Sequence, residues 1–213
     1  MDCCVDTQAI DAYFDKRKAR REAEQYRRKG LASHARAMLA AVSGAGLQDA
    51  SVLEIGGGIG GLQIELLQRG AAHATNVEVS AAYLAAAQTL AGQLGLVDRV
   101  SYHRGDFTRD ADSIPAADMV IMHRVVCCYP DMPGLVSVAA RHARRRLALS
   151  FPRDAWHVRL FIEAQALWMR MKGSPFRTYV HSPAAIFRVA AEAGLKPAHQ
   201  AYSGPWQIVV FEP

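Results

Sequence analysis

The sequence lacks a long uninterrupted apolar run. No stretch of about 18 apolar residues occurs, which argues against a bilayer-spanning helix. The first residues, Met1 to Asp6, include neither a basic segment nor an apolar one, so they do not resemble a secretory signal. Internal repeats, low-complexity stretches and long linkers are also missing. We therefore expect a single-domain cytoplasmic protein with no membrane span.

Cysteine is scarce and is placed in adjacent pairs. The four cysteines form Cys3-Cys4 and Cys127-Cys128. Neighbouring cysteines rarely bridge each other, and neither pair has the spacing that wraps a zinc ion. We expect no metal site, and we interpret Cys127 and Cys128 as small buried side chains near the end of a strand.

Positive charge is in excess and is unevenly distributed. The 213 residues carry a formal charge of +5, and eight basic residues lie between Lys16 and Lys29 against Glu22 and Glu24. A second cluster, Arg141 to Arg146, contains four arginines. Such clusters can bind nucleic acid, but on helices they are more often solvated faces. The second interpretation is favoured.

The order of elements predicts an α/β fold. Short apolar strands alternate with helices, and the last two strands, joined by Ser203-Gly204-Pro205, form a hairpin. We predict a doubly wound, mostly parallel seven-stranded sheet with helices on both faces and an antiparallel last strand. The predicted strands are 51–55, 74–79, 99–103, 117–122, 146–151, 196–202 and 206–211. The predicted helices are 7–29, 33–42 (capped by Ser33), 60–68, 80–94 (capped by Ser80), 135–143, 154–171 and 182–194 (capped by Ser182).

These elements suggest regions within the one domain, 1–213. We expect an N-terminal helical lid (1–45), a cofactor-binding core (46–151), a helical insertion near the substrate (152–181), and a closing helix and β-hairpin (182–213).

The most informative motif is a glycine-rich loop between a strand and a helix. Gly56, Gly58 and Gly60 permit a sharp turn, and the following helix N-terminus offers free N–H groups to a ligand. With Gly61, however, the loop also satisfies the G-x-G-x-x-G pattern of dinucleotide sites. Glu78, after the second strand, can accept hydrogen bonds from a ribose in either case. The loop alone leaves the cofactor open.

Three further features favour S-adenosylmethionine over a nicotinamide dinucleotide. Glu54 precedes the loop, where a carboxylate would repel a pyrophosphate but suit the amino group of a methionine moiety. Asp106 can accept from an adenine amino group while Phe107 packs against the ring. The closing hairpin is unusual for a dinucleotide domain. Alternatively, Glu54 holds the loop through backbone N–H groups, and Asp106 caps a short helix.

The segment Val52 to Ile121 resembles the class I S-adenosylmethionine-dependent methyltransferases, which have an acid before G-x-G-x-G, a second acid after strand two and a reversed final strand. The resemblance implies that the cofactor's amino-acid part lies against the loop glycines, its ribose at Glu78 and its adenine at Asp106. The full set of expected cofactor residues is Glu54, Gly56, Gly57, Gly58, Gly60, Glu78, Val79, Asp106, Phe107 and His123.

A weaker similarity links Tyr13-Phe14-Asp15, the run His123 to Asp131, and Leu147 to Phe151 to the magnesium-protoporphyrin O-methyltransferase group. That group carries histidine before its Tyr-Pro, where this chain has Cys128. The difference leaves the substrate unassigned.

The acceptor site is expected beyond the carboxyl ends of the strands. His123 is the candidate general base, with a structural role as the alternative, and Tyr129 lies beside it. Tyr13, Phe14, Trp156 and His157 are candidate substrate residues, although aromatic residues at helical spacing more often pack in a core.

The sequence therefore predicts an S-adenosylmethionine-dependent methyltransferase that acts on a small molecule, at oxygen or nitrogen. An RNA methyltransferase that uses the basic N-terminal helix is the alternative, and an NAD(P)-dependent oxidoreductase is less favoured. No oligomeric state is predicted.

Overall fold

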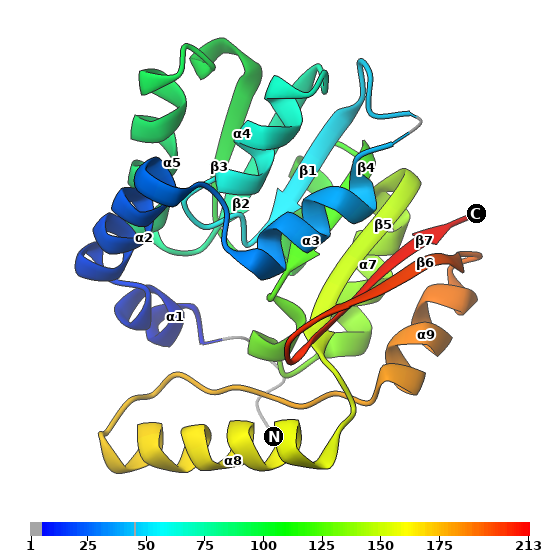
Figure 1. Ribbon diagram of the computed structural model, residues 1–213. Helices are drawn as coiled ribbons and strands as arrows, with labels where there is room; N and C mark the ends of the chain where they lie inside the picture. The colour runs from blue at the N-terminus through cyan, green and yellow to red at the C-terminus, as the bar shows by residue number, and fades with distance from the viewer. Residues whose placement is uncertain (1–5, 45) are drawn as a thin grey trace.

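The computed structural model describes residues 6–44 and 46–213, and its centre is a seven-stranded sheet (Figure 1). The strand order is β3-β2-β1-β4-β5-β7-β6. The first five strands are parallel, and β7 runs antiparallel to both β5 and β6. The predicted sheet is confirmed. The strands are β1 (Ser51–Ile55), β2 (His73–Glu78), β3 (Val100–Arg104), β4 (Ala117–His123), β5 (Ala143–Pro152), β6 (Lys196–Ser203) and β7 (Trp206–Glu212).

Helices cover both faces of this sheet, because side chains alternate along each strand. On β1, Leu53 packs into a core with α7 and α9, whereas Val52 packs into a second core with α3 and α4. Both side chains are almost fully buried. The helices are α1 (Thr7–Tyr13), α2 (Lys16–Lys29), α3 (Ser33–Val42), α4 (Gly61–Gln68), α5 (Ala81–Gln93), α6 (Phe107–Asp110), α7 (Met132–His142), α8 (Trp156–Met171) and α9 (Pro183–Glu192).

The N-terminal region differs from the prediction in two respects. The single helix predicted over 7–29 is two helices, because the Asp15 side chain accepts from the Lys18 backbone N–H at 2.8 Å and caps α2. The predicted cap Ser33 is wrong: it is the first helical residue of α3, and Ala32 occupies the cap position. Ser80, by contrast, caps α5 as predicted.

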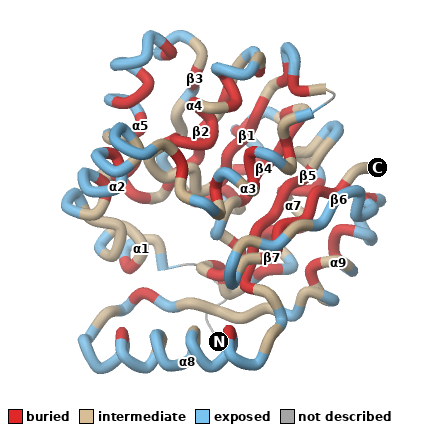
Figure 2. The backbone as a smooth tube through the Cα atoms, in the orientation of Figure 1, coloured by how far each residue is buried: buried red, intermediate tan, exposed pale blue. Residues whose placement is uncertain are grey.

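The helix α8 stands apart from the sheet along one edge of the molecule (Figure 1). Only Val158 and Met169 of this helix are buried. Its large apolar side chains face outward, as the exposed colouring of α8 in Figure 2 shows. Apolar residues at helical spacing more often pack in a core, but most of the large apolar side chains of α8 do not. Within the described residues, no helix is long and apolar enough to cross a membrane.

Candidate functional site: a cavity at the carboxyl ends of the strands

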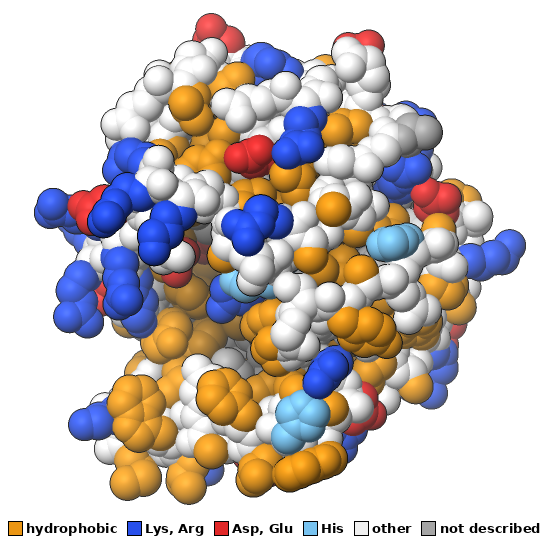
Figure 3. Space-filling model, viewed as in Figure 1, with side chains coloured by type: hydrophobic (Ala, Val, Ile, Leu, Met, Phe, Trp, Pro, Cys, Tyr) orange, Lys and Arg blue, Asp and Glu red, His pale blue; other side chains and the backbone are white. Residues whose placement is uncertain are grey.

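A cavity of about 630 Å³ lies where β1, β2 and β4 end. Its size is that of a typical small-molecule site. Figure 3 shows the hollow between α8 and the rest of the molecule. Of the predicted cofactor residues, nine line it: Glu54, Gly56, Gly57, Gly58, Glu78, Val79, Asp106, Phe107 and His123. Gly60 does not line the cavity, because it is the N-cap residue of α4.

The glycine loop has the backbone that its sequence predicts. Gly56 and Gly58 have φ values of +62° and +58°, which favour glycine. At Gly56 an added Cβ would lie 2.5 Å from a methyl group of Val125, so the protein itself excludes a side chain there. At Gly58 the nearest atom, on Tyr83, would be 3.6 Å away. An added Cβ at Gly58 would thus touch the Tyr83 ring at an ordinary van der Waals distance, and Gly58 itself lines the cavity.

Two buried carboxylates flank this loop. Glu78 accepts backbone hydrogen bonds from Gly58 and Ser80, both at 2.9 Å, which fixes it beside the glycine turn. Burial raises its pKa, and these backbone bonds oppose that change.

Glu54 accepts fewer hydrogen bonds than Glu78. Its side chain is 3% exposed and accepts one backbone hydrogen bond, from Gln63 at 3.2 Å. Burial raises its pKa to about 8. The hydrogen bond from Gln63 agrees with the alternative role suggested by the sequence, in which Glu54 holds the backbone next to the glycine loop. The carboxylate has no positive partner among the described residues. A cationic amino group in the cavity would supply that partner.

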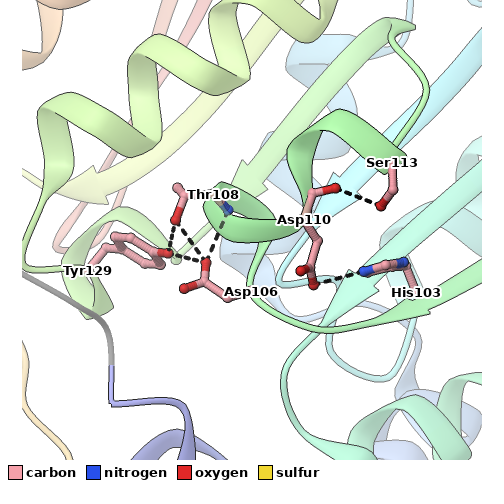
Figure 4. Close-up of polar contacts among 6 residues, drawn as sticks. All are labelled: His103, Asp106, Thr108, Asp110, Ser113 and Tyr129. Carbon is pink, nitrogen blue, oxygen red and sulfur yellow. Dashed lines mark hydrogen bonds and ion pairs between the residues drawn. The ribbon is translucent and has the colours of Figure 1, made fainter.

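Asp106 belongs to a hydrogen-bonded group at the start of α6 (Figure 4). Its Oδ1 accepts from the backbone N–H and the hydroxyl of Thr108, each at 3.0 Å, and from the hydroxyl of Tyr129. Capping the helix is therefore one role of Asp106. Burial raises the pKa of Tyr129, and the hydrogen bond to Asp106 adds to this effect. The Tyr129 hydroxyl is held as a protonated donor, which suits positioning of Asp106 better than the catalytic role predicted for Tyr129.

His123 is engaged at both ring nitrogens. Its Nδ1 lies 2.9 Å from the Ser150 hydroxyl, and its Nε2 lies 2.8 Å from Nδ1 of His34. The His34 and His123 rings are stacked, with centroids 5.0 Å apart. The pKa of His34 is lowered to about 4, mainly by burial and then by the Arg124 guanidinium. The pKa of His123 is lowered to about 3, mainly by burial and then by His34 and Arg124. Both imidazoles are neutral near pH 7.

The proton positions in this pair follow from Arg124, whose guanidinium can only donate. It lies 3.5 Å from Nε2 of His34, so that nitrogen carries the lone pair and Nδ1 carries the hydrogen. His34 then donates to Nε2 of His123, and His123 donates from Nδ1 to Ser150. In this arrangement the one lone pair not used within the pair is on Nε2 of His34, which sequence reasoning missed, and it faces the Arg124 guanidinium at 3.5 Å.

Aromatic side chains form another wall of the cavity. Tyr13 stacks on Phe176 with ring centroids 4.3 Å apart, and Phe14 packs edge-on against Phe176 and Tyr83. Tyr13 and Phe14 thus lie where the sequence placed them, in the cavity lining.

Two other predicted substrate residues do not reach the cavity. Trp156 is 77% exposed, and neither it nor His157 lines the hollow. Their side chains project from the outer side of α8, because the helix turns Val158 and Ile162 inward instead. We correct that part of the substrate site accordingly.

The basic helix α2 packs on α5 through its small residues Ala19 and Ala23, and most of its charged side chains face solvent. Arg20 pairs with Glu24 on the same helix at 2.8 Å. Of the basic side chains of α2, Lys18 lines the cavity. The favoured interpretation, a solvated helix face, agrees with this arrangement.

The cysteines agree only in part with the prediction. Cys127 is buried and Cys128 is half-buried, in a short turn after β4, and both thiols are free. Cys3 and Cys4 lie outside the described residues. Across residues 6–44 and 46–213, no group of three metal-ligating side chains comes together.

Comparison with known proteins gives a match over part of the chain. Residues 52–146, a little under half of the chain, match the family described as a methyltransferase domain. No curated protein matches the chain significantly.

Solved structures share the fold of this chain. Magnesium protoporphyrin IX methyltransferase from Synechocystis PCC 6803, with bound SAH, has a TM-score of 0.77 at 22% identity, over 97% of this chain and 99% of that one. An O-methyltransferase family protein from Burkholderia thailandensis has a TM-score of 0.74 at 17% identity, over 94% and 61%. An O-methyltransferase family 2 protein from Planctomyces limnophilus, in complex with apigenin, has a TM-score of 0.70 at 21% identity, over 92% and 61%.

Proposed function

We propose that this protein is an S-adenosylmethionine-dependent methyltransferase that methylates an oxygen or nitrogen atom of a small, largely apolar molecule. The observation that carries the proposal is the cavity, which is lined both by the glycine loop and by the aromatic side chains of Tyr13, Phe14 and Phe176. Most basic side chains of α2 lie outside it, which favours a small molecule over RNA. The structural relatives that act on or bind protoporphyrin and apigenin support the same class of acceptor.

The residues at the loop fit S-adenosylmethionine. Glu54, buried without a positive partner, would hold the amino group of the methionine moiety, and Glu78 would accept from the ribose hydroxyls. Asp106, with Oδ2 free of the hydrogen bonds that occupy Oδ1, would accept from the adenine amino group. When bound, the cofactor supplies an activated methyl carbon, so alignment of the acceptor can provide much of the rate acceleration.

Where the acceptor atom is a hydroxyl oxygen, its proton must leave as the new bond forms. We assign this proton to Nε2 of His34, because that nitrogen carries the lone pair and His34 lines the cavity. The stacked His123 holds the tautomer of His34 through the 2.8 Å contact, and Ser150 holds His123 in turn. The low pKa of His34 ensures that it is unprotonated at neutral pH and returns the proton to solvent.

The glycine loop provides the test. Gly58→Ala adds a methyl group at a residue that lines the cavity, 3.6 Å from the Tyr83 ring and at a φ of +58°. Gly95→Ala is the matched control, since Gly95 has a φ of +68°, no atom within 4 Å of an added Cβ, and a position outside the cavity. Both variants carry a similar backbone strain of about 1 kcal/mol, so any difference between them in ligand affinity reports the site.

Isothermal titration calorimetry with S-adenosylhomocysteine makes the measurement. We expect binding to the wild type and to Gly95→Ala, and binding at least about tenfold weaker, or about 1.4 kcal/mol, for Gly58→Ala. Equal affinity for the two variants would place the cofactor elsewhere. Binding of NAD in preference to S-adenosylhomocysteine would overturn the proposed function.

A further inference from the structure

The outer face of α8 is the largest group of exposed apolar side chains on the described chain. Trp156 and Met171, at its two ends, are 77% and 78% exposed, and Trp168 is 59% exposed. Leu160, Phe161 and Leu167 are exposed to similar degrees. Soluble monomers rarely leave a contiguous patch of this kind uncovered. The patch therefore indicates an interaction surface.

The helical spacing brings these side chains to one side. Positions 156, 160, 167 and 171 are separated by four, seven and four residues, so they form a stripe along the helix. The buried residues Val158 and Met169 lie on the other side, toward the protein. The helix thus has two apolar faces, of which the protein covers one. Figure 3 shows the hydrophobic side chains gathered along α8, below the hollow.

Basic side chains border this apolar stripe. The segment 153–177, which contains α8 and its flanks, carries five basic residues and two acidic ones. Arg159 and Arg170 lie on the helix beside the stripe, and Lys172 follows its end. One of the two acids, Asp154, is paired with Arg159 at 2.8 Å. An apolar face with two tryptophans and a basic border is the composition of helices that lie in the interface of an anionic membrane.

The stripe is also continuous with the cavity wall. Phe161, which is 66% exposed, lines the cavity together with Val158 and Ile162. A surface that rests against α8 therefore lies next to the opening of the site. The segment 153–177 has more basic than acidic residues, with Glu163 the one acid on α8, so a second copy on this face would bring two net positive surfaces together, which is unfavourable.

We propose that the outer face of α8 docks on the surface of an anionic lipid bilayer. The apolar stripe enters the headgroup region, and the bordering cations face the lipid phosphates. The helix lies in the interface and does not span the bilayer, in agreement with the absence of a spanning helix from the described residues. The cavity then opens beside the membrane. This proposal does not depend on the methyltransferase activity.

Vesicle binding tests the proposal directly. The full chain is mixed with vesicles of phosphatidylcholine that contain about 30% phosphatidylglycerol, and with vesicles of phosphatidylcholine alone. We expect co-sedimentation with the anionic vesicles and at least about tenfold weaker binding to the neutral ones. Trp156 lies on the stripe and the exposed Trp168 lies beside it, so the tryptophan fluorescence emission is expected to shift to the blue on binding.

The decisive variant is Leu160→Gln/Leu167→Gln/Met171→Gln, which removes apolar side chains from the stripe and keeps both tryptophans as reporters. The matched control is Leu94→Gln/Val97→Gln, at exposed apolar positions (46% and 57%) on the far end of α5. We expect the first variant to lose vesicle binding by at least about tenfold and the control to retain it. Circular dichroism checks that both are folded.

Three results would overturn the proposal. The first is that the wild type does not co-sediment with anionic vesicles and its tryptophan emission does not change. The second is a loss of binding in the control variant equal to that in the stripe variant. The third is that light scattering shows a wild-type dimer that persists when anionic vesicles are added, whereas the stripe variant is a monomer. A second copy of the chain would then cover the face.

Discussion

The stacked pair of His34 and His123 predicts how the stability of the fold depends on pH. Both pKa values are lowered, to about 4 and about 3, mainly by burial. In the unfolded chain each imidazole titrates near pH 6.5. Below that pH the two imidazoles bind protons in the unfolded state but not in the folded state, so the free energy of unfolding falls as the pH falls. The contribution of the pair is therefore complete above about pH 7 and declines toward about pH 4.

The expected loss can be calculated from these values. At about pH 5, an imidazole that stays neutral only in the folded state costs about 2 kcal/mol, or 1.36 kcal/mol for each of about 1.5 pH units. We assign this full loss of about 2 kcal/mol to His123. His34 is half-buried, so after solvent screening it contributes about half as much, or about 1 kcal/mol. The wild type is expected to lose about 3 kcal/mol from the pair between about pH 7.5 and pH 5.

Urea denaturation at both pH values measures this loss. The reference is the double variant His34→Asn/His123→Asn, in which the two imidazoles cannot titrate while the other histidines still do. The quantity compared is the change in unfolding free energy with pH, so a lower starting stability of the variant does not matter. His34→Asn alone provides an intermediate case. If the double variant loses as much stability as the wild type, the pair is not held neutral, and the proton assignment for His34 fails.

Other expectations concern the cavity and its support. Tyr129→Phe removes the hydroxyl that donates to Asp106 and should lower stability by about 1 kcal/mol, with weaker S-adenosylhomocysteine affinity in calorimetry; unchanged affinity would show that Asp106 needs no such support. Ser80→Ala removes the cap of α5 and the 2.7 Å hydrogen bond to the Phe14 carbonyl, so thermal unfolding should show a loss of about 1–2 kcal/mol. His34→Asn should lower kcat for a hydroxyl acceptor by about 100-fold or more without changing cofactor affinity, and a parallel loss of affinity would instead indicate a structural role.

The parts predicted well from sequence are those encoded locally. The strand, the glycine turn and the capped helix at Ser80 depend on neighbouring residues, and short apolar runs between helices mark the central strands of the sheet. The break between α1 and α2 was not predicted, because Asp15, the cap of α2, lies next to a run of charged residues that did not distinguish it from a helix interior position. Gly60 was misplaced for a similar reason, since a motif gives spacing but not which side of the turn faces the cavity.

The proton-accepting group was missed because it depends on the tertiary fold. His34 and His123 are 89 residues apart, and nothing in the sequence around His34 distinguishes it from a surface histidine. Phe176 was missed likewise, since it comes to the cavity from the extended segment after α8. The exposure of α8 was also hidden, because periodicity identifies the apolar side of a helix but not whether the protein covers it.

The position of β7 between β5 and β6 has a consequence for folding during synthesis. β7 follows β5 and β6 in the chain but pairs with both of them, through Val209 with Leu149 and with Gln200. Until β7 leaves the ribosome, β6 has no partner in the sheet, and β5 presents an unpaired apolar edge. Such edges promote aggregation of nascent chains. A ribosome stalled before residue 206 would therefore hold a chain in which β6 cannot join the sheet.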